Sequence, residues 1–261
     1  MQLWRFLMPS ALGFTVRNGR HLLVDWARGA PAMPLRVRDF VAQHARPGDP
    51  EDVLRTMDRF ATEVRFLMNI GPAKGPLVRE LLARLPADAR ILELGAFCGY
   101  SSILLANTLG AKGRIVSIEA SSDSVEGARA NIEFAGLSDR IEVVHGKSTE
   151  TIPTLDGSFN LVFLDHWKDL YRTDLELIER SGLINPGSLV VADNVGQLFG
   201  AHEYLEYVRS CGRYESENRT ATLEYSDIPD AVEVSIFRGG SGRNPERVLN
   251  QEREAVLPLV R

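Results

Sequence analysis

Short apolar runs alternate with helix-forming segments along most of the chain, and this alternation limits the fold more than any other feature. Four of the runs carry apolar residues without strict alternation: ILELG, RIVSI, LVFLD and SLVVAD. A strand that is buried on both faces requires this pattern, which is typical of parallel sheets covered by helices on each side. The sequence therefore predicts an α/β fold with a doubly wound, mostly parallel sheet.

The alternation places the expected elements along the chain. Strands are predicted at 90–94, 114–118, 140–144, 161–164 and 189–192, with helices between them at 100–109, 124–135, 148–154 and 171–180. Two further strands, at 221–225 and 232–238, are separated only by the turn SDIPDA and form a hairpin. Earlier helices are predicted from residue 35, from 50 to about 66 and from 76 to 85, with a Gly/Pro-rich loop, MNIGPAKG, at 68–75.

Composition narrows the class of protein. The chain has 261 residues, of which 44% are hydrophobic and 25% charged, values typical of a soluble globular protein. Residues 35–240 are expected to form one domain, between an N-terminal extension (1–34) and a C-terminal tail (241–261). The net charge of −5 argues against a nucleic-acid partner, because proteins that bind phosphate backbones carry a basic excess. Two cysteines alone are typical of a reducing compartment, so we expect a cytoplasmic protein.

The N-terminal extension is apolar over residues 3–16 and 21–27, although Arg5 and Pro9 interrupt the first patch. The patch is shorter than the ~20 residues that span a bilayer, and no basic stretch precedes it as in a secretory signal. We expect the extension to pack on the domain or on a partner chain. The alternative is an interfacial helix, which would give residues 1–30 a weak membrane contact. No feature of the sequence indicates an oligomeric state.

A glycine turn, ELGAFCGYS, follows the first predicted strand. Gly95 permits a tight turn, and Gly99 lets the backbone approach a ligand at a helix N-terminus. Glu119 ends the next strand, where a carboxylate can accept hydrogen bonds from ribose hydroxyls. The glycine spacing does not match G-x-G-x-x-G, and Glu93 would repel a pyrophosphate but suits a cationic sulfonium or amino group. The turn therefore favours S-adenosylmethionine over NAD, with a purely structural turn as the alternative.

Polar side chains also end the fourth and fifth predicted strands. Asp165 follows the fourth strand, and Asp193 and Asn194 follow the fifth. We expect the three to converge, because ligands of open α/β sheets bind at the carboxyl ends of the strands. Two carboxylates and an amide form an oxygen-ligand set that suits Mg²⁺. The alternative is that they cap the turns that follow.

Two further residues could act on a substrate. Lys168 lies three residues beyond Asp165, where a divalent ion would favour the neutral amine that can serve as a base. The alternative is a solvated lysine. Glu224 falls in a predicted strand of mixed polarity and, on its own, has the character of a surface residue.

At this point several separate motifs, in order, resemble the catechol O-methyltransferase family: MNIGPAKG, ILELGAFCGYSS, VFLDHWKD, VVADN and LEY. The resemblance covers about residues 37–239. It implies a Rossmann-like methyltransferase fold with a seven-stranded sheet whose last strand is antiparallel. It also implies that the chain transfers a methyl group from S-adenosylmethionine to one hydroxyl of a small catechol or related phenol, with Mg²⁺ as a second cofactor.

The resemblance assigns catalytic roles residue by residue. Asp165, Asp193 and Asn194 would hold Mg²⁺, which also takes both catechol oxygens. Lys168 would be the general base, and Glu224 would form a hydrogen bond with the second hydroxyl. Substrate contacts would therefore include Asn194 and Glu224, with a hydrophobic wall at position 66.

The same resemblance assigns the donor site. Glu93 would face the methionine amino group and Glu119 the ribose. The adenine pocket would be lined by Ser148, His166 and Trp167. The other donor-site residues come from the loop before the first strand, the glycine turn and the fourth strand end: Met68, Ile70, Gly95, Gly99, Tyr100, Ser101 and Asp165.

Several positions depart from the family pattern. Phe66 stands where the family usually has Trp over the acceptor ring, Pro72 where it has Asp, Phe97 where it has Tyr, and Thr149 where it has Gln. The loop 196–201 is one residue longer and lacks the family's proline wall. These departures leave the metal set, the base and the ribose carboxylate intact, and they bear on acceptor preference and donor affinity.

Three alternatives to a catechol acceptor stay open on the sequence. The same reaction could use another vicinal diphenol or a hydroxylated aromatic. The chain could instead be a catalytically idle protein that binds S-adenosylmethionine and serves as an interaction module. An NAD-dependent dehydrogenase is the third alternative.

Overall fold

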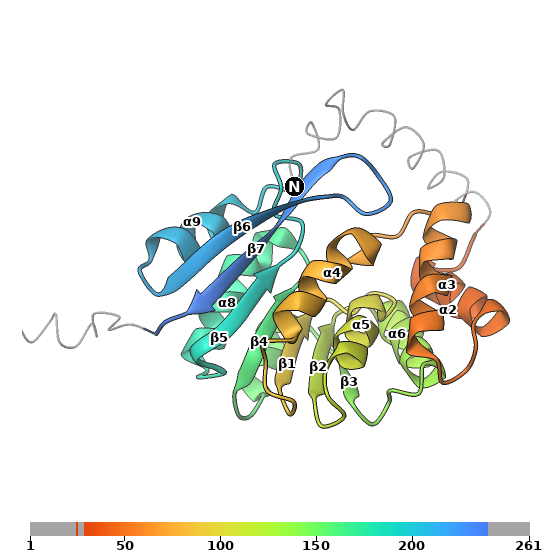
Figure 1. Ribbon diagram of the computed structural model, residues 1–261, viewed down its shortest axis with the longest axis horizontal. Helices are drawn as coiled ribbons and strands as arrows, with labels where there is room; N and C mark the ends of the chain where they lie inside the picture. The colour runs from red at the N-terminus through yellow and green to blue at the C-terminus, as the bar shows by residue number, and fades with distance from the viewer. Residues whose placement is uncertain (1–24, 26–28, 240–261) are drawn as a thin grey trace, which may run out of the picture.

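A sheet with the strand order β3-β2-β1-β4-β5-β7-β6 runs through the computed structural model, which describes Asp25 and residues 29–239 (Figure 1). Neighbouring strands from β3 to β5 are parallel, whereas β7 is antiparallel to both β5 and β6. The predicted doubly wound sheet of seven strands with an antiparallel last strand is thus confirmed. The strands are β1 (Arg90–Leu94), β2 (Arg114–Glu119), β3 (Ile141–His145), β4 (Phe159–Leu164), β5 (Ile184–Ala192), β6 (Tyr214–Thr222) and β7 (Pro229–Phe237).

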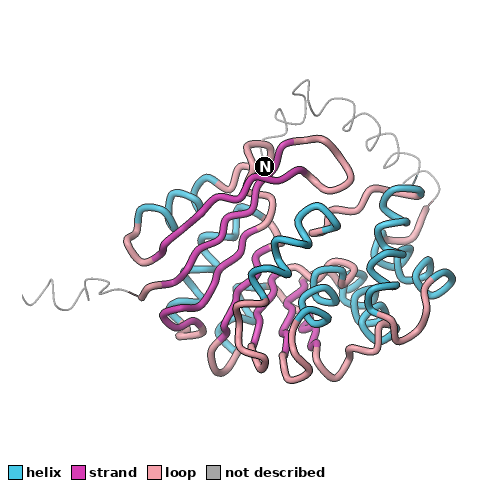
Figure 2. Tube along the Cα trace, in the orientation of Figure 1, coloured by secondary structure: helices cyan, strands magenta, loops and turns pink. Residues whose placement is uncertain are grey.

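Helices cover both faces of the sheet, as the cyan segments on either side of the magenta strands show (Figure 2). One face carries α2 (Met33–His44), α3 (Pro50–Glu63), α4 (Gly71–Leu82), α5 (Tyr100–Thr108) and α6 (Ser122–Phe134). The other carries α7 (Ser148–Thr151), α8 (Tyr171–Arg180) and α9 (His202–Ser210). Successive strand residues supply the two apolar cores in turn, which explains the unbroken apolar runs.

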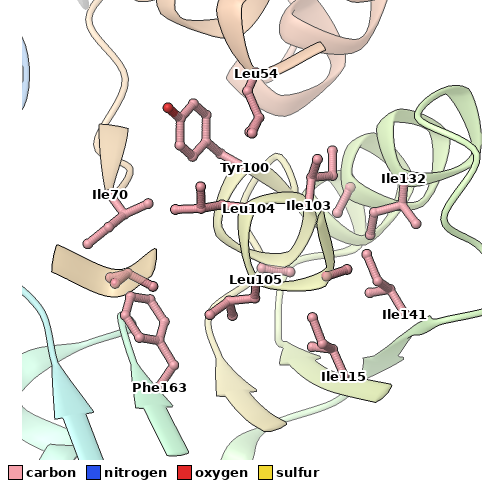
Figure 3. Close-up of a cluster of buried hydrophobic side chains, with 14 of the residues drawn as sticks. Leu54, Ile70, Tyr100, Ile103, Leu104, Leu105, Ile115, Ile132, Ile141 and Phe163 are labelled. Atoms are coloured by element: carbon pink, nitrogen blue, oxygen red, sulfur yellow. The ribbon is translucent and has the colours of Figure 1, made fainter. Parts of the chain in front are cut away.

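Helix α5 fixes the position of the glycine turn that precedes it. Ile103, Leu104 and Leu105 of this helix are buried in one cluster with Ile115 of β2 and Phe163 of β4 (Figure 3). Because α5 is apolar around most of its circumference, it is buried between the sheet and the outer helices. Its N-terminus therefore lies at a defined place beyond the end of β1.

Several predicted boundaries differ from the structure. Helix α4 begins at Gly71 rather than at 76, so residues 71–75 of the predicted loop are helical. Pro72 occupies its first turn, where the missing N–H has no intrahelical partner to lose. Strand β6 spans Tyr214–Thr222 rather than 221–225, and α9 was not predicted at all. The N-terminal cap of α3 is Asp49, whose side chain accepts a hydrogen bond from the backbone N–H of Asp52 at 3.0 Å.

Most of the N-terminal extension and all of the C-terminal tail (241–261) lie outside the described residues. The same holds for most of residues 1–30, for which an interfacial helix was the alternative expectation. In the part of the chain that the structure describes, no helix is both long and apolar enough to cross a membrane.

Candidate functional site

The glycine turn is sterically closed to other residues. Gly95 has a φ of 103°, and a Cβ there would lie 2.6 Å from the carbonyl oxygen of Asp165. Gly99 has a φ of 85°, and its Cβ would lie 3.3 Å from Cα of Ala128 on α6. Both positions thus need glycine for the left-handed backbone and for a close approach. This packing holds the ends of β1 and β4 against each other at the base of the site.

Glu119 lies next to the glycine turn. Its Oε2 accepts from the backbone N–H of Phe97 at 3.0 Å, and its Oε1 from that of Ser121 at 2.8 Å. A carboxylate has about four lone-pair sites, so both oxygens keep capacity for a ligand hydroxyl. The two backbone bonds fix the position of the carboxylate beside the glycine turn.

Glu93 is fully buried beneath the turn. Its Oε2 accepts hydrogen bonds from the hydroxyls of Ser102 and Ser117, whereas Oε1 has no partner among the described residues. Burial raises the pKa of Glu93, and hydrogen bonds from three serines, including Ser101, oppose the rise. Glu93 thus combines one oxygen that accepts from serine hydroxyls with one that has no hydrogen bond among the described residues.

The predicted metal set forms at the ends of β4 and β5. The register pairs Leu164 with Ala192, so Asp165 and Asp193 follow at neighbouring positions. Among the described residues, Asp193 Oδ2 and Asn194 Oδ1 are buried without a hydrogen-bond partner. A buried oxygen without a partner costs free energy, which a bound cation would remove. These atoms therefore fit a hard cation.

The set is small. The described residues contain no group of three or more His, Cys, Asp or Glu side chains that could hold a metal. Asn194 completes the predicted set as an amide, and its left-handed φ of 52° is a conformation that Asn tolerates better than most residues.

Lys168 lies beside this set. Its Nζ is 3.4 Å from Asp165 Oδ1 and 3.1 Å from the carbonyl oxygen of His166, and it lies over the Tyr171 ring at 5.0 Å. Its side chain is only 13% exposed, which excludes the solvated alternative. Burial raises the pKa of Asp165 to about 7, and the Lys168 charge opposes that rise. An ammonium and a carboxylate thus form an ion pair in a largely buried part of the site.

Glu224 is not the strand residue on the surface that the sequence predicts. It follows the end of β6 and is fully buried. Its Oε2 accepts from the backbone N–H of Ala73 at 3.2 Å, and a Cβ on Gly71 would overlap this carboxylate. Burial raises the pKa of Glu224 to about 8, opposed by the Lys74 charge. Its Oε1 is buried without a hydrogen-bond partner among the described residues.

The residues expected in the adenine pocket, and Met68 elsewhere in the donor site, differ in exposure. Trp167 is 70% exposed and Met68 42%, the two large hydrophobic side chains that stand out in the described chain. His166 binds Asp174 through Nε2 at 2.8 Å, and its Nδ1 is buried without a partner there. Burial lowers the pKa of His166, which favours the neutral ring. Ser148 begins α7 and is buried.

Two predicted donor-site residues turn their side chains elsewhere. Ile70 is fully buried in the core beside α5 (Figure 3). Tyr100 forms a hydrogen bond with Asp58 of α3. Their side chains instead secure the loop before α4 and the start of α5.

A hydrophobic wall forms near Glu224. Leu198, Phe199, Leu223 and Ile228 make a small buried cluster against which Phe66 packs. The wall therefore combines the two segments that depart from the family pattern, position 66 and the loop 196–201.

Two buried charged residues were not singled out from the sequence. Lys74 of α4 donates to Asp193 and to Asp230, each at 2.6 Å. These partners are 119 and 156 positions away along the chain, so no spacing rule could pair them. The sequence signal for Lys74 was its position among apolar, Gly and Pro residues at 70–78.

Known proteins match this chain over most of its length. A model of the O-methyltransferase family matches residues 49–201, a range with the glycine turn and the metal set. The catechol O-methyltransferase of Bos taurus is 39% identical, over 79% of this chain and 77% of the relative. Catechol O-methyltransferase B of Danio rerio is 38% identical, over 91% and 93%. The crystal structure of cofactor-bound Rv0187 from MTB is 27% identical with a TM-score of 0.62, over 72% and 91%.

Proposed function

The chain belongs to the O-methyltransferase family that includes the catechol O-methyltransferases, and from this premise we propose a Mg²⁺-dependent transfer of a methyl group from S-adenosylmethionine to one hydroxyl of a catechol. The observation that carries the proposal is the pair of buried, unpartnered oxygens, Asp193 Oδ2 and Asn194 Oδ1, in the same site as the Lys168–Asp165 ion pair. An idle binding module has no physical need for this combination.

Asp165, Asp193 and Asn194 would hold the Mg²⁺. Oxygen ligands from one or two carboxylates, with places left for substrate oxygens, are the arrangement that this ion prefers. When bound, the ion supplies positive charge that makes a nearby hydroxyl more acidic. The positive charge of Lys74 offsets the negative charge of Asp193, so the carboxylates of the predicted metal set repel each other less.

Lys168 would take the proton of the attacking hydroxyl. Its ammonium now donates to Asp165 and to a carbonyl oxygen, so the amine can move a proton only after it has released its own. Glu224 would hold the second hydroxyl. As a carboxyl group with a pKa of about 8, it can donate to an acceptor oxygen at neutral pH through its otherwise unpartnered side.

The methyl donor would lie between the glycine turn and Trp167. Glu93 Oε1 would accept from its amino group and Glu119 from its ribose. The exposed faces of Trp167 and Met68 would cover its apolar surface. The reaction is a displacement at carbon, so the main task of these residues is to align oxygen, methyl and sulfur.

The acceptor is expected to be a planar ring with two adjacent hydroxyls. Phe66 and the loop 196–201 supply an apolar wall beside the polar groups. This wall differs from the family pattern, so a vicinal diphenol other than a simple catechol is the nearest alternative.

An acceptor panel tests the proposal. Labelled S-adenosylmethionine and Mg²⁺ are mixed with the protein and with catechol, resorcinol or phenol in equal amounts. We expect methylated catechol and little product from the other two, because only catechol presents adjacent hydroxyls. Equal methylation of phenol would contradict the two-oxygen acceptor. Donor binding without any product would favour the idle module.

A further inference from the structure

Asp230 lies behind the predicted metal set, at the second residue of β7. Its side chain has no exposed surface, and neither have those of Lys74 and Asp193. The Lys74 ammonium lies between the two carboxylates, 2.6 Å from Asp193 Oδ1 and 2.6 Å from Asp230 Oδ2. A fully buried carboxylate next to the site, without a role in binding or chemistry so far, requires an explanation.

Asp230 also contacts the residue that supplies the amide ligand. Its Oδ2 accepts from Asn194 Nδ2 at 2.8 Å, and its Oδ1 accepts from the backbone N–H of Gly196 at 3.1 Å. Asp230 therefore binds three donors from α4 and from the segment that follows β5. Three of its about four lone-pair sites are used, so Asp230 has little capacity left to act as a ligand itself.

The geometry points to Asp230 as a positioning residue for metal binding. An ionised carboxylate can only accept hydrogen bonds, so the NH₂ group of Asn194 must face Asp230. The carbonyl oxygen of the same amide then faces away from Asp230, and this Oδ1 is the buried atom without a partner. With the amide reversed, its two N–H groups would face the cation site and exclude a cation.

Asp193 is oriented by the same cluster. Its Oδ1 accepts from Lys74 and from the backbone N–H of Asn194 at 2.7 Å, which leaves Oδ2 as its unpartnered atom. Both free oxygens of the set thus result from one network that runs from Lys74 through Asp230 to Asn194. Partners behind a metal ligand commonly contribute about 10–100-fold to metal affinity.

This assignment rests on the proposed Mg²⁺ site, and two variants test it. Asp230→Asn keeps the side-chain shape but removes the charge and one obligatory acceptor. Asp230→Glu keeps the charge but displaces the acceptor by one methylene. Arg213→Met is the control, because it breaks the partly buried Glu179–Arg213 ion pair near the start of β5, at the opposite end of the strand from Asp193.

Mg²⁺ alone is titrated into each protein by calorimetry, and the unfolding temperature of each metal-free protein is measured in parallel. We expect the Mg²⁺ dissociation constant to rise about 10–100-fold in both Asp230 variants and to stay at the wild-type value in Arg213→Met. S-adenosylmethionine affinity without metal should be the same in all four proteins, which a general loss of structure would not allow.

The outcomes separate the two claims. A wild-type Mg²⁺ affinity in Asp230→Glu would mean that only charge matters and would overturn the positioning role. A wild-type affinity in Asp230→Asn would overturn it as well, and this variant keeps the test valid if Asp230→Glu fails to fold. Absence of Mg²⁺ binding in the wild type would instead overturn the metal site of the proposed function, and the positioning role with it.

Discussion

The ammonium of Lys74 and the carboxylate of Asp193 form an ion pair, 2.6 Å from Nζ to Oδ1, in which neither side chain has exposed surface. Burial alone would lower the pKa of Lys74, but the charges of Asp193 and Asp230 outweigh it and raise that pKa. The lysine therefore stays charged, and its single positive charge offsets one of the two negative charges of Asp193 and Asp230.

The first prediction is a loss of stability in Lys74→Met. Removing one partner of a buried pair leaves an uncompensated charge, which costs about 3–5 kcal/mol of the free energy of unfolding. Arg46→Met serves as the control, because Arg46 is 70% exposed and its pairs with Asp49 and Asp52 should contribute at most about 1 kcal/mol. Urea unfolding measures both. An equal loss of unfolding free energy in the two variants would contradict the prediction that the buried ion pair contributes more than the exposed ones.

The second prediction concerns proton removal. Lys168→Ala should lower turnover by about 10²-fold or more, since a positioned base contributes about that much, while donor affinity stays near wild type. Lys112→Ala, at an exposed position in the loop before β2, is the matched control and should keep full turnover. Single-turnover methyl transfer measures the effect. A near-normal rate in Lys168→Ala would assign proton removal to solvent or to the metal.

Much of this site could be predicted from the sequence. Asp165, Asp193 and Asn194 were predictable because the strands before them are buried on both faces and unmistakably apolar. The end of a parallel strand also fixes where the next side chain lies. Local pattern was sufficient wherever the position of a residue depends on its own strand.

Other features depend on contacts that no local pattern encodes. Strand β6 is polar along its length and is held by its pairing with β7, so its bounds were missed. Glu224 is buried only because the end of β6 lies against the first turn of α4. The helix α9 had a signal, since the buried Tyr204 and Val208 are one helical turn apart, and it was overlooked.

The third prediction is a pH-dependent difference between the wild type and Glu224→Gln. The pKa of Glu224 rises from its ordinary 4.5 to about 8 on folding. Below pH 4.5 the carboxyl is protonated in both the folded and the unfolded state. As the pH rises, the unfolded state loses this proton first, so stability is lost progressively up to and through pH 8.

The amide of Glu224→Gln does not titrate and should escape this loss. Metal-free Glu224→Gln is therefore expected to match the wild type near pH 4 and to unfold at an increasingly higher temperature than the wild type as the pH approaches 8. Calorimetric unfolding at a series of pH values measures the difference. A difference that is constant with pH would mean that the folded-state pKa of Glu224 is not raised.

The fourth prediction concerns the apolar wall. Phe66→Ala should raise KM for catechol about tenfold, since removing part of an aromatic contact costs on the order of 1–2 kcal/mol, with a smaller change in kcat. Phe66→Trp, which restores the family residue, should not raise KM. Phe237→Ala, at the far end of β7, is the control. An unchanged KM in Phe66→Ala would place the acceptor away from this wall.

Mg²⁺-dependent methylation of catechol is tested most directly with labelled S-adenosylmethionine. Methyl transfer is measured first with Mg²⁺, then with excess chelator, and then with Mg²⁺ restored. We expect O-methylated catechol in the first condition, almost none in the second, and renewed product formation in the third. Product formation at an undiminished rate in the presence of chelator would contradict the assignment of Asp165, Asp193 and Asn194 to a catalytic Mg²⁺ site.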